Sequence, residues 1–142
     1  MADLLLIDDD IDVLEINRKF LTNEGFTVHI ADKPQKGIEL ARKLTPSCIV
    51  LDVMMPEMDG IELINHVRSD FSTSHIPIVM ITAKHEDDTQ LKAMKYGADG
   101  YIAKPFTMEL LMARIDNMLD RRKALISRMS EQKKVDISPE EI

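Results

Sequence analysis

Five short apolar segments recur along the chain, and each pair is separated by a stretch long enough for a helix. They are residues 4–8 (LLLID), 27–31 (TVHIA), 48–52 (CIVLD), 76–82 (IPIVMIT) and 100–104 (GYIAK). Most of these segments are continuously apolar and do not alternate with polar residues. That pattern is typical of strands buried on both faces of a parallel sheet. The sequence therefore predicts strands at these five places.

The segments between the strands carry the spacing and the end signals of amphipathic helices. The first has Asp10 as a candidate N-cap and Gly25 as its C-terminal stop. The second has Pro34 near its start and Pro46 beyond its end. Three more follow, at residues 60–70, 86–97 and 107–122. Strict alternation of strand and helix predicts an open, doubly wound, five-stranded parallel sheet.

Length, charge and cysteine content exclude several classes of protein. The 142 residues suffice for one domain with a hydrophobic core, and the net charge of −7 argues against nucleic-acid binding by this chain alone. The single cysteine, Cys48, begins an apolar strand, so we expect a buried thiol, no intrachain disulfide and a reducing compartment. Neither a signal peptide nor an apolar run of transmembrane length is recognisable. We expect a soluble, cytoplasmic protein that does not associate with a membrane.

Charged and polar side chains stand where four of the predicted strands end. Asp8 and Asp9 follow the first strand, Asp52 ends the third, Thr82 the fourth and Lys104 the fifth. In an open α/β sheet the carboxyl ends of the strands form one edge, and ligands bind there. We therefore expect these five side chains to share one rim of the sheet. Taken singly, Thr82 or Lys104 would be an ordinary strand-end or surface residue, so the prediction depends on the whole set.

The three carboxylates at this rim predict a bound cation, because they cannot all stay ionised close together at neutral pH without one. Oxygen ligands accompanied by water suit Mg²⁺. Asp8 and Asp9 are the predicted metal ligands, with Asp52 beside them, and the backbone carbonyl of Met54 is placed to be a further ligand. The sequence thus predicts a magnesium site.

The remaining groups of the rim complete a site for phosphoryl transfer. A hydroxyl, an ammonium group and a metal ion together can surround the three equatorial oxygens of a transferring phosphoryl group. Asp52 is then the nucleophile and forms an aspartyl phosphate. Thr82 and Lys104 stabilise the charge on the phosphoryl oxygens.

The residues around the rim also match a known pattern. Four blocks, LLIDDD, IVLDVMMPEMDG, IPIVMITAK and GADGYIAKPF, occur in this order, and over residues 3–121 the chain resembles the receiver domain of bacterial two-component response regulators. The resemblance implies a flavodoxin-like (βα)₅ fold, and a phosphoryl group taken from a histidine kinase, a phosphotransfer domain or a small donor such as acetyl phosphate. Matched residue by residue, it implies that Asp52 is the acceptor, Asp8 and Asp9 the acidic pair, Thr82 the switch hydroxyl and Lys104 the essential lysine.

The resemblance further implies how a signal would be transmitted. Tyr101 matches the switch aromatic residue, which turns inward after phosphorylated Asp52 has drawn in Thr82. The face formed by the fourth predicted helix, the fifth strand and the fifth helix then repacks, and partners read that face. A homodimer could form through the same face or through the last helix.

Three positions near the site carry expectations that rest on the family alone. The Lys104–Pro105 peptide bond is expected to be cis. Met54, by its side chain, and Lys84 occupy positions that vary in the family and overhang the phosphoryl group. An apolar Met54 cannot orient an attacking water as an amide could, and Lys84 could pair with the phosphoryl group, so we expect a phosphorylated state that is not especially short-lived. The alternative is that both are ordinary rim residues.

The composition changes after residue 120. Residues 1–120 carry 12 basic and 21 acidic side chains, whereas residues 121–142 carry six and four. A heptad-like stripe, interrupted by Arg122, comprises Leu111, Ile115, Met118, Leu125 and Met129. It predicts an extended C-terminal helix that runs past the domain edge, either as a rod able to form a dimeric coiled coil or as a frayed polar helix end.

The last residues, SPEEI, have the pattern of another helix start, with Ser138 as N-cap and Pro139 in the first position. We therefore expect a receiver domain at residues 1–121 and a helical extension or linker at residues 122–142 that leads toward a missing output domain. A complete stand-alone receiver is the alternative.

Two other functions fit part of the pattern. A Mg²⁺-dependent phosphohydrolase with an aspartyl-phosphate intermediate needs a second acid two residues after the nucleophile, and that position is Met54. A receiver-like docking module that is never phosphorylated would not need all five rim residues. The sequence favours a phosphorylatable signalling switch over an enzyme that turns over substrates.

Overall fold

The computed structural model describes residues 2–53, 60–82 and 97–121. Its labelled elements are β1 (Asp3–Ile7), α1 (Ile11–Asn23), β2 (Thr27–Ala31), α2 (Pro34–Leu44), β3 (Cys48–Asp52), α3 (Gly60–Ser69), β4 (Ile78–Thr82) and β5 (Gly100–Ala103). Residues 108–121 form one more helix, here called the C-terminal helix. Within these ranges, no helix has the length and apolar character that crossing a membrane requires. Met54, Lys84, most of the helix expected at residues 86–97 and the extension at 122–142 lie outside the described residues.

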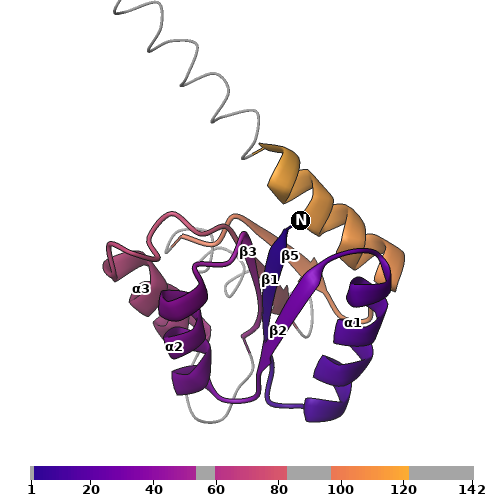
Figure 1. Ribbon diagram of the computed structural model, residues 1–142, viewed down its shortest axis with the longest axis horizontal. Coiled ribbons are helices and arrows are strands. Elements are labelled where there is room, and N and C mark those ends of the chain that lie inside the picture. The colour runs from indigo at the N-terminus through magenta and orange to yellow at the C-terminus, as the bar shows by residue number, and fades with distance from the viewer. Residues whose placement is uncertain (1, 54–59, 83–96, 122–142) are drawn as a thin grey trace, which may run out of the picture.

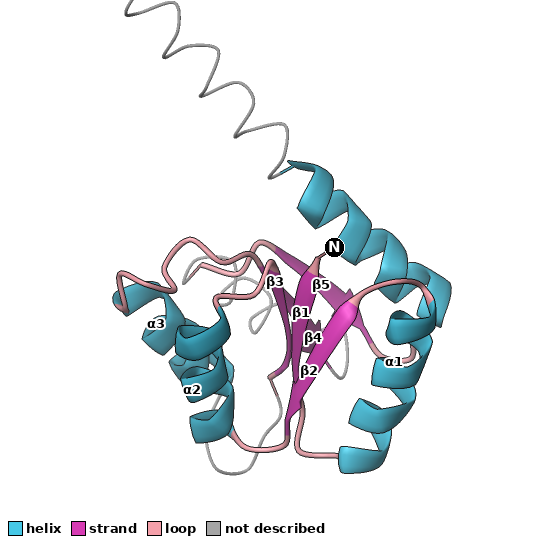
Figure 2. Cartoon of the chain, in the orientation of Figure 1, coloured by secondary structure: helices cyan, strands magenta, loops and turns pink. Residues whose placement is uncertain are grey.

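The described strands form one five-stranded parallel sheet in the order β2-β1-β3-β4-β5. Helices α2 and α3 cover one face of the sheet, and α1 and the orange C-terminal helix cover the other (Figure 1). Figure 2 shows the magenta strands enclosed between these two helical layers. The predicted doubly wound parallel sheet is confirmed, and its strand order is that of flavodoxin-like folds.

Burial on both faces explains why the strand sequences are continuously apolar. In β1, Leu5 and Ile7 belong to the core beneath α2 and α3, whereas Leu4 and Leu6 belong to the core beneath α1 and the C-terminal helix. All residues of β3 and β4 are buried. Because successive side chains of a strand point to opposite faces, a strand covered on both sides needs apolar residues at every position.

Local sequence signals set the ends of the helices. The Asp10 carboxylate accepts hydrogen bonds from the backbone N–H groups of Asp12 at 3.0 Å and Val13 at 3.3 Å, so Asp10 is the N-cap of α1. Gly25, just after α1, has a φ of 105°, a conformation that glycine adopts readily. Pro34 is the first residue of α2. These three signals act as the sequence predicted.

Gly60, the first residue of α3, lets the helix approach the end of β3 closely. Its N–H donates to the carbonyl of Val53 at 3.2 Å. A Cβ at this position would lie 2.5 Å from the Cα of Val53, so any other residue would push the helix away. Because Val53 follows Asp52 directly, this glycine helps to place one side of the carboxyl edge of the sheet.

Candidate functional site

The polar residues expected at the strand ends lie at one rim of the sheet. Asp8 directly follows β1, Asp52 and Thr82 are the last residues of β3 and β4, and Lys104 directly follows β5. Strands β3, β4 and β5 pair in parallel, so their carboxyl ends point the same way. The structure therefore brings together side chains that the sequence distributes over most of the domain.

Three carboxylates form the centre of this rim. Asp8, Asp9 and Asp52 each place an oxygen atom within 4.8 Å of the others. Asp8 is 5% exposed and Asp52 is 3% exposed, whereas Asp9 is open to solvent. Hard oxygen donors, some shielded and one in contact with water, are a ligand set that could hold a divalent metal ion together with water molecules.

Burial and the neighbouring charges alter the pKa of Asp8. Burial raises the pKa of Asp8 to about 6, and the negative charge of Asp52 acts in the same direction. The backbone N–H of Asp10, which donates to Asp8 Oδ1 at 3.0 Å, opposes this rise. A cation among the three carboxylates would relieve their repulsion, so the charge distribution of the rim fits a metal site.

Lys104 provides a positive charge beside Asp52. Its Nζ donates to Asp52 Oδ2 at 2.9 Å. Partial burial would lower the pKa of Lys104, but the hydrogen bond to Asp52 and the negative charges of the rim outweigh it, so this pKa is raised. The lysine side chain is 41% exposed while that of Asp52 is 3% exposed. Solvent therefore reaches the lysine side chain but hardly reaches the carboxylate that it pairs with.

Backbone hydrogen bonds hold the rim in place. The N–H of Val53 donates to the carbonyl of Ile81 at 3.1 Å, and the N–H of Lys104 donates to the carbonyl of Thr82 at 2.8 Å. Each bond continues a strand pairing one residue beyond the strand, so Asp52, Thr82 and Lys104 project from a fixed backbone. Thr82 itself is buried, with 2% of its surface exposed.

Two further predicted positions are on β5 and directly after it. Tyr101 is on β5, and 41% of its surface is exposed. Together with Arg114 and Met118 it borders a hollow of about 260 Å³ between β5 and the C-terminal helix. The Lys104–Pro105 peptide bond is cis. Tyr101 thus faces outward in this structure, beside the helix that packs on the same face.

Sequence reasoning did not single out Arg68 and Asp99, which connect elements at the opposite end of the sheet. Arg68 Nη2 donates to Asp99 Oδ2 at 2.8 Å, and the backbone N–H of Ile78 donates to the same oxygen at 2.8 Å. An arginine in the last turn of a helix is common, and 31 positions separate it from Asp99. No local spacing could have indicated this contact.

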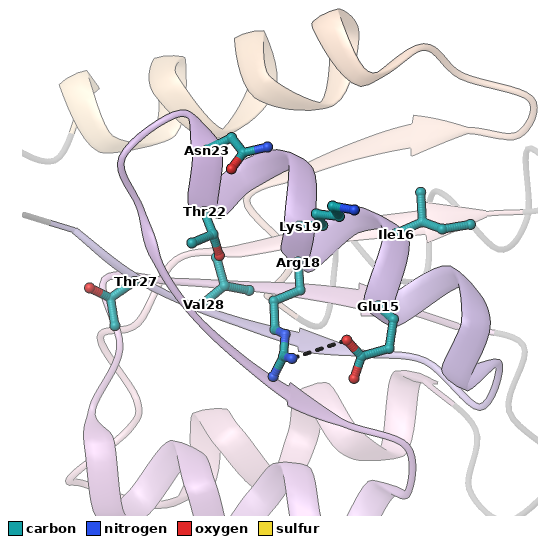
Figure 3. Close-up of a pocket in the computed structure, with 8 residues that line it drawn as sticks. All are labelled: Glu15, Ile16, Arg18, Lys19, Thr22, Asn23, Thr27 and Val28. Carbon is teal, nitrogen blue, oxygen red and sulfur yellow. Dashed lines mark ion pairs between the residues drawn. The ribbon is translucent and has the colours of Figure 1, made fainter.

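A wide groove lies away from the rim, along α1 and β2. Figure 3 shows its lining, with the dashed line marking the ion pair between Arg18 and Glu15 at 3.1 Å. The groove has a volume of about 710 Å³, and Ile16 and Val28 add apolar surface to it. No predicted site residue lines it, and an exposed ion pair of this kind contributes little energy. We therefore take the carboxylate rim, and not this groove, as the candidate site.

Known proteins match this chain over most of its length. The family model of the response regulator receiver domain matches residues 4–116. The transcriptional regulatory protein SrrA of Staphylococcus aureus is 35% identical over 129 residues, which make up 91% of this chain and 52% of SrrA. The chain therefore spans about half the length of the curated relatives it matches.

Solved structures share the fold over nearly their full length. The chemotaxis protein CheY4 of Vibrio cholerae superposes with a TM-score of 0.80 at 29% identity, covering 84% of this chain and 99% of CheY4. A response regulator receiver domain protein of Clostridium thermocellum gives a TM-score of 0.81 at 27% identity, covering 88% of this chain and 99% of that one. A two-component response regulator of Clostridium difficile gives a TM-score of 0.80 at 29% identity, covering 86% of this chain and 98% of that one.

Proposed function

This chain belongs to the response regulator receiver domain family of two-component signalling, and from that premise we propose that it is a phosphorylatable switch whose phosphoacceptor is Asp52. The observation that carries the proposal is the setting of Asp52. Its carboxylate is 3% exposed, has two further carboxylates within 4.8 Å and accepts a hydrogen bond from Lys104. A buried acid among like charges and one lysine is a setting that structural ion pairs rarely need and that phosphoryl transfer uses.

The phosphoryl donor is the phosphohistidine of a histidine kinase or phosphotransfer domain, or a small donor such as acetyl phosphate. A carboxylate oxygen of Asp52 attacks phosphorus, the bond between phosphorus and the donor breaks, and the donor leaves with the bonding electron pair. Lys104 Nζ, at 2.9 Å from Asp52 Oδ2 before the reaction, then shifts to an oxygen of the new phosphoryl group. The product is an aspartyl phosphate.

Asp8 and Asp9 would hold Mg²⁺ together with Asp52 and the backbone carbonyl of Met54. When bound, Mg²⁺ supplies positive charge beside the phosphoryl oxygens. Asp8 must be ionised to act as a ligand, and with a pKa of about 6 it is mostly ionised at neutral pH. The protein's own contribution is to keep these oxygens fixed, since Asp8 is held by the N–H of Asp10 at 3.0 Å.

The phosphorylated state would be transmitted from Asp52 to β5. The phosphoryl group draws in the hydroxyl of Thr82, and the hydrogen bond from Lys104 N–H to the Thr82 carbonyl, at 2.8 Å, couples that movement to the strand that carries Tyr101. Tyr101 turns inward from its exposed position. The face formed by the helix expected at residues 86–97, β5 and the C-terminal helix then repacks. A partner or a second copy of this chain recognises the repacked face.

The surroundings of the switch follow from the family. We propose that residues 1–121 are the receiver domain and that residues 122–142, which lie outside the described residues, connect it to an output domain, since the chain spans about half of the curated relatives. The switch works in the cytoplasm, as bacterial response regulators generally do. With a net charge of −7, this chain does not bind nucleic acid by itself, so contact with DNA would belong to the output domain.

A docking module that is never phosphorylated is the second candidate, and a phosphohydrolase is the third. The phosphohydrolase lacks the acid it needs, because Met54 stands two residues after the nucleophile. The docking module is disfavoured by Asp8, since nothing in docking requires a buried carboxyl with a pKa of about 6 next to Asp52. The receiver acts as a signalling domain that assists only its own phosphorylation and dephosphorylation.

The first test is intact-protein mass spectrometry after incubation with acetyl phosphate, with and without Mg²⁺. The wild type and the Asp12→Asn variant, which changes an exposed aspartate on α1 outside the rim, should each gain one phosphoryl group in the presence of Mg²⁺. Asp52→Asn should gain none. No adduct in the wild type would refute the mechanism and favour the docking module. An adduct that forms without Mg²⁺, or that survives in Asp52→Asn, would refute the roles given to the metal ion and to Asp52.

A further inference from the structure

The guanidinium group of Arg68 connects three backbone segments at the end of the sheet opposite to Asp52. Arg68 lies in the last turn of α3, and its side chain is 22% exposed. Nε donates to the carbonyl of Gly97 at 3.0 Å, and Nη2 donates to the same carbonyl at 2.7 Å. Nη1 donates to the carbonyls of Ser74 at 3.0 Å and Ile76 at 2.6 Å. With the bond from Nη2 to Asp99, every N–H of the guanidinium group is used.

Asp99 joins this group to the first residue of β4. Its Oδ2 accepts from Arg68 Nη2 and from the backbone N–H of Ile78, each at 2.8 Å. Its own N–H donates to the carbonyl of Ile78 at 2.9 Å. The turn that leads into β5 is therefore held to β4 by the backbone and to α3 by Arg68.

Gly97 permits the close approach of the guanidinium group. Its φ of 117° is a conformation that other residues rarely adopt. A Cβ at Gly97 would lie 2.9 Å from Arg68 Nε, so a side chain would displace the guanidinium group. The backbone on both sides of Asp99 is thus shaped to receive Arg68.

Strand β5 depends on these contacts more than the inner strands do. It has four residues, lies at the end of the strand order and pairs with β4 alone among the described strands. Beyond its last residue comes Lys104, whose N–H bonds to the Thr82 carbonyl and whose Nζ reaches Asp52. The start of β5 is held by Arg68 and its end carries the lysine of the rim.

We propose that Arg68 is a positioning residue for Lys104: by fixing the start of β5, it sets where this short edge strand delivers the lysine to Asp52. The inference rests on the proposed phosphoacceptor function of Asp52. A lysine at position 68 could not replace the arginine, because an ammonium group has three donors and lacks the planar fork that serves three carbonyls and a carboxylate at once. A shift of about 1 Å at a reacting group can slow a reaction on the order of 100-fold, so small displacements of β5 matter.

The variant that tests this is Arg68→Lys, and Arg42→Lys is its matched control. Arg42 also pairs with an aspartate of the loop after α3, through Nε to Asp70 Oδ2 at 2.6 Å, but this pair does not involve β5. The phosphorylation rate with acetyl phosphate and Mg²⁺ is measured at a temperature where every variant is folded. Arg68→Lys should be slower on the order of tenfold, and Arg42→Lys should match the wild type. Equal rates for Arg68→Lys and the wild type would overturn the proposal.

A double-mutant cycle with Lys104→Ala separates positioning from general destabilisation. If Arg68 acts through Lys104, Arg68→Lys should have no further effect on the rate once Lys104 is alanine. An equal slowing in both backgrounds would mean that Arg68 acts through the fold and would overturn the proposal. If Arg68→Lys does not fold, Asp99→Asn, which keeps an oxygen acceptor and removes the charge, takes its place in the same cycle with the same expectation.

Amide hydrogen exchange gives a readout that does not depend on phosphorylation. In Arg68→Lys, the N–H of Lys104 should exchange faster relative to amides of β3, in addition to the N–H groups of Ile78 and Asp99 next to the lost side chain. Faster exchange confined to Ile78 and Asp99 would show that Arg68 holds only its own surroundings, and the inference would be wrong. If the wild type takes up no phosphoryl group at all, the proposed function fails instead, and the exchange result still decides whether Arg68 positions Lys104.

Discussion

Lys104 Nζ lies 2.9 Å from Asp52 Oδ2, although 52 positions separate the two residues in the chain. The contact places a cation beside a carboxylate that is 3% exposed and close to two further carboxylates. It compensates the charge of Asp52, while burial and the proximity of Asp52 raise the pKa of Asp8. Three clustered carboxylates and one lysine leave the rim with excess negative charge, which fits the proposed metal site.

Removing the lysine should destabilise the metal-free protein. In Lys104→Met, Asp52 stays buried and loses one hydrogen-bonded cation, so the free energy of unfolding at neutral pH should fall by about 1–2 kcal/mol, less than for a fully buried pair because the lysine is partly exposed. Urea denaturation without Mg²⁺ measures this change. Lys43→Met, which alters an exposed lysine of α2, should change stability little. Equal losses in the two variants would contradict the prediction.

The stability of the metal-free protein should depend on the protonation of Asp8. Its pKa is raised from 3.8 to about 6, so the folded state keeps this proton where the unfolded chain has lost it. The resulting stabilisation is present in full below about pH 4 and is lost as the pH rises through about 6. Asp8→Asn cannot lose a proton there, so between pH 4 and pH 7 it should gain on the order of 2 kcal/mol relative to the wild type.

Thermal or urea unfolding of the wild type and Asp8→Asn across this pH range, in the presence of a chelator, measures the difference. Asp12→Asn serves as the control, because Asp12 is in the first turn of α1 and outside the carboxylate group. Its pH profile should run parallel to that of the wild type. If the stability of Asp8→Asn also changes with pH in parallel with that of the wild type, the pKa of Asp8 is not raised as its burial implies.

Mg²⁺ binding should be opposed by protons. Asp8 must give up its proton to become a ligand, so the affinity for Mg²⁺, measured by calorimetry, should fall as the pH is lowered below about 6. Asp9→Asn should weaken binding at neutral pH because it removes one of the three clustered carboxylates. Chelation of Mg²⁺ should lower the melting temperature of the wild type at neutral pH. A pH-independent affinity would argue that the ion binds elsewhere.

The lifetime of the phosphorylated state should depend on two positions that the sequence predicts near the phosphoryl group and that lie outside the described residues. Met54→Asn adds an amide able to orient an attacking water, and Lys84→Ala removes a cation that could pair with the phosphoryl group. Each variant should lose its phosphoryl group faster than the wild type. The decay of the adduct is followed by mass spectrometry after removal of the donor. An unchanged decay rate in Met54→Asn would leave Met54 as an ordinary rim residue.

Much of this protein can be worked out from its sequence by itself. The positions of the strands were predictable because burial on both faces demands an apolar residue at every step, as in Cys48–Asp52. The start of α1 was predictable because a carboxylate in the N-cap position accepts from N–H groups two or three residues ahead, as Asp10 does. In both cases the signal lies within one short segment. The rim residues followed because strand ends are recognisable and parallel strands end at one edge.

Only the tertiary structure decided how far these groups interact. The order β2-β1-β3-β4-β5 places β3 between β1 and β4. This arrangement, not any local pattern, buries Asp8, which raises its pKa, and brings Asp52 close enough to add to that rise. The contacts of Arg68 with Gly97 and Asp99 were likewise invisible in the sequence, because an arginine at a helix end is compatible with many surroundings. Periodicity reports whether a residue is buried, whereas the identity of its neighbour depends on how distant segments pack, and the charges and hydrogen bonds of this site arise from those neighbours.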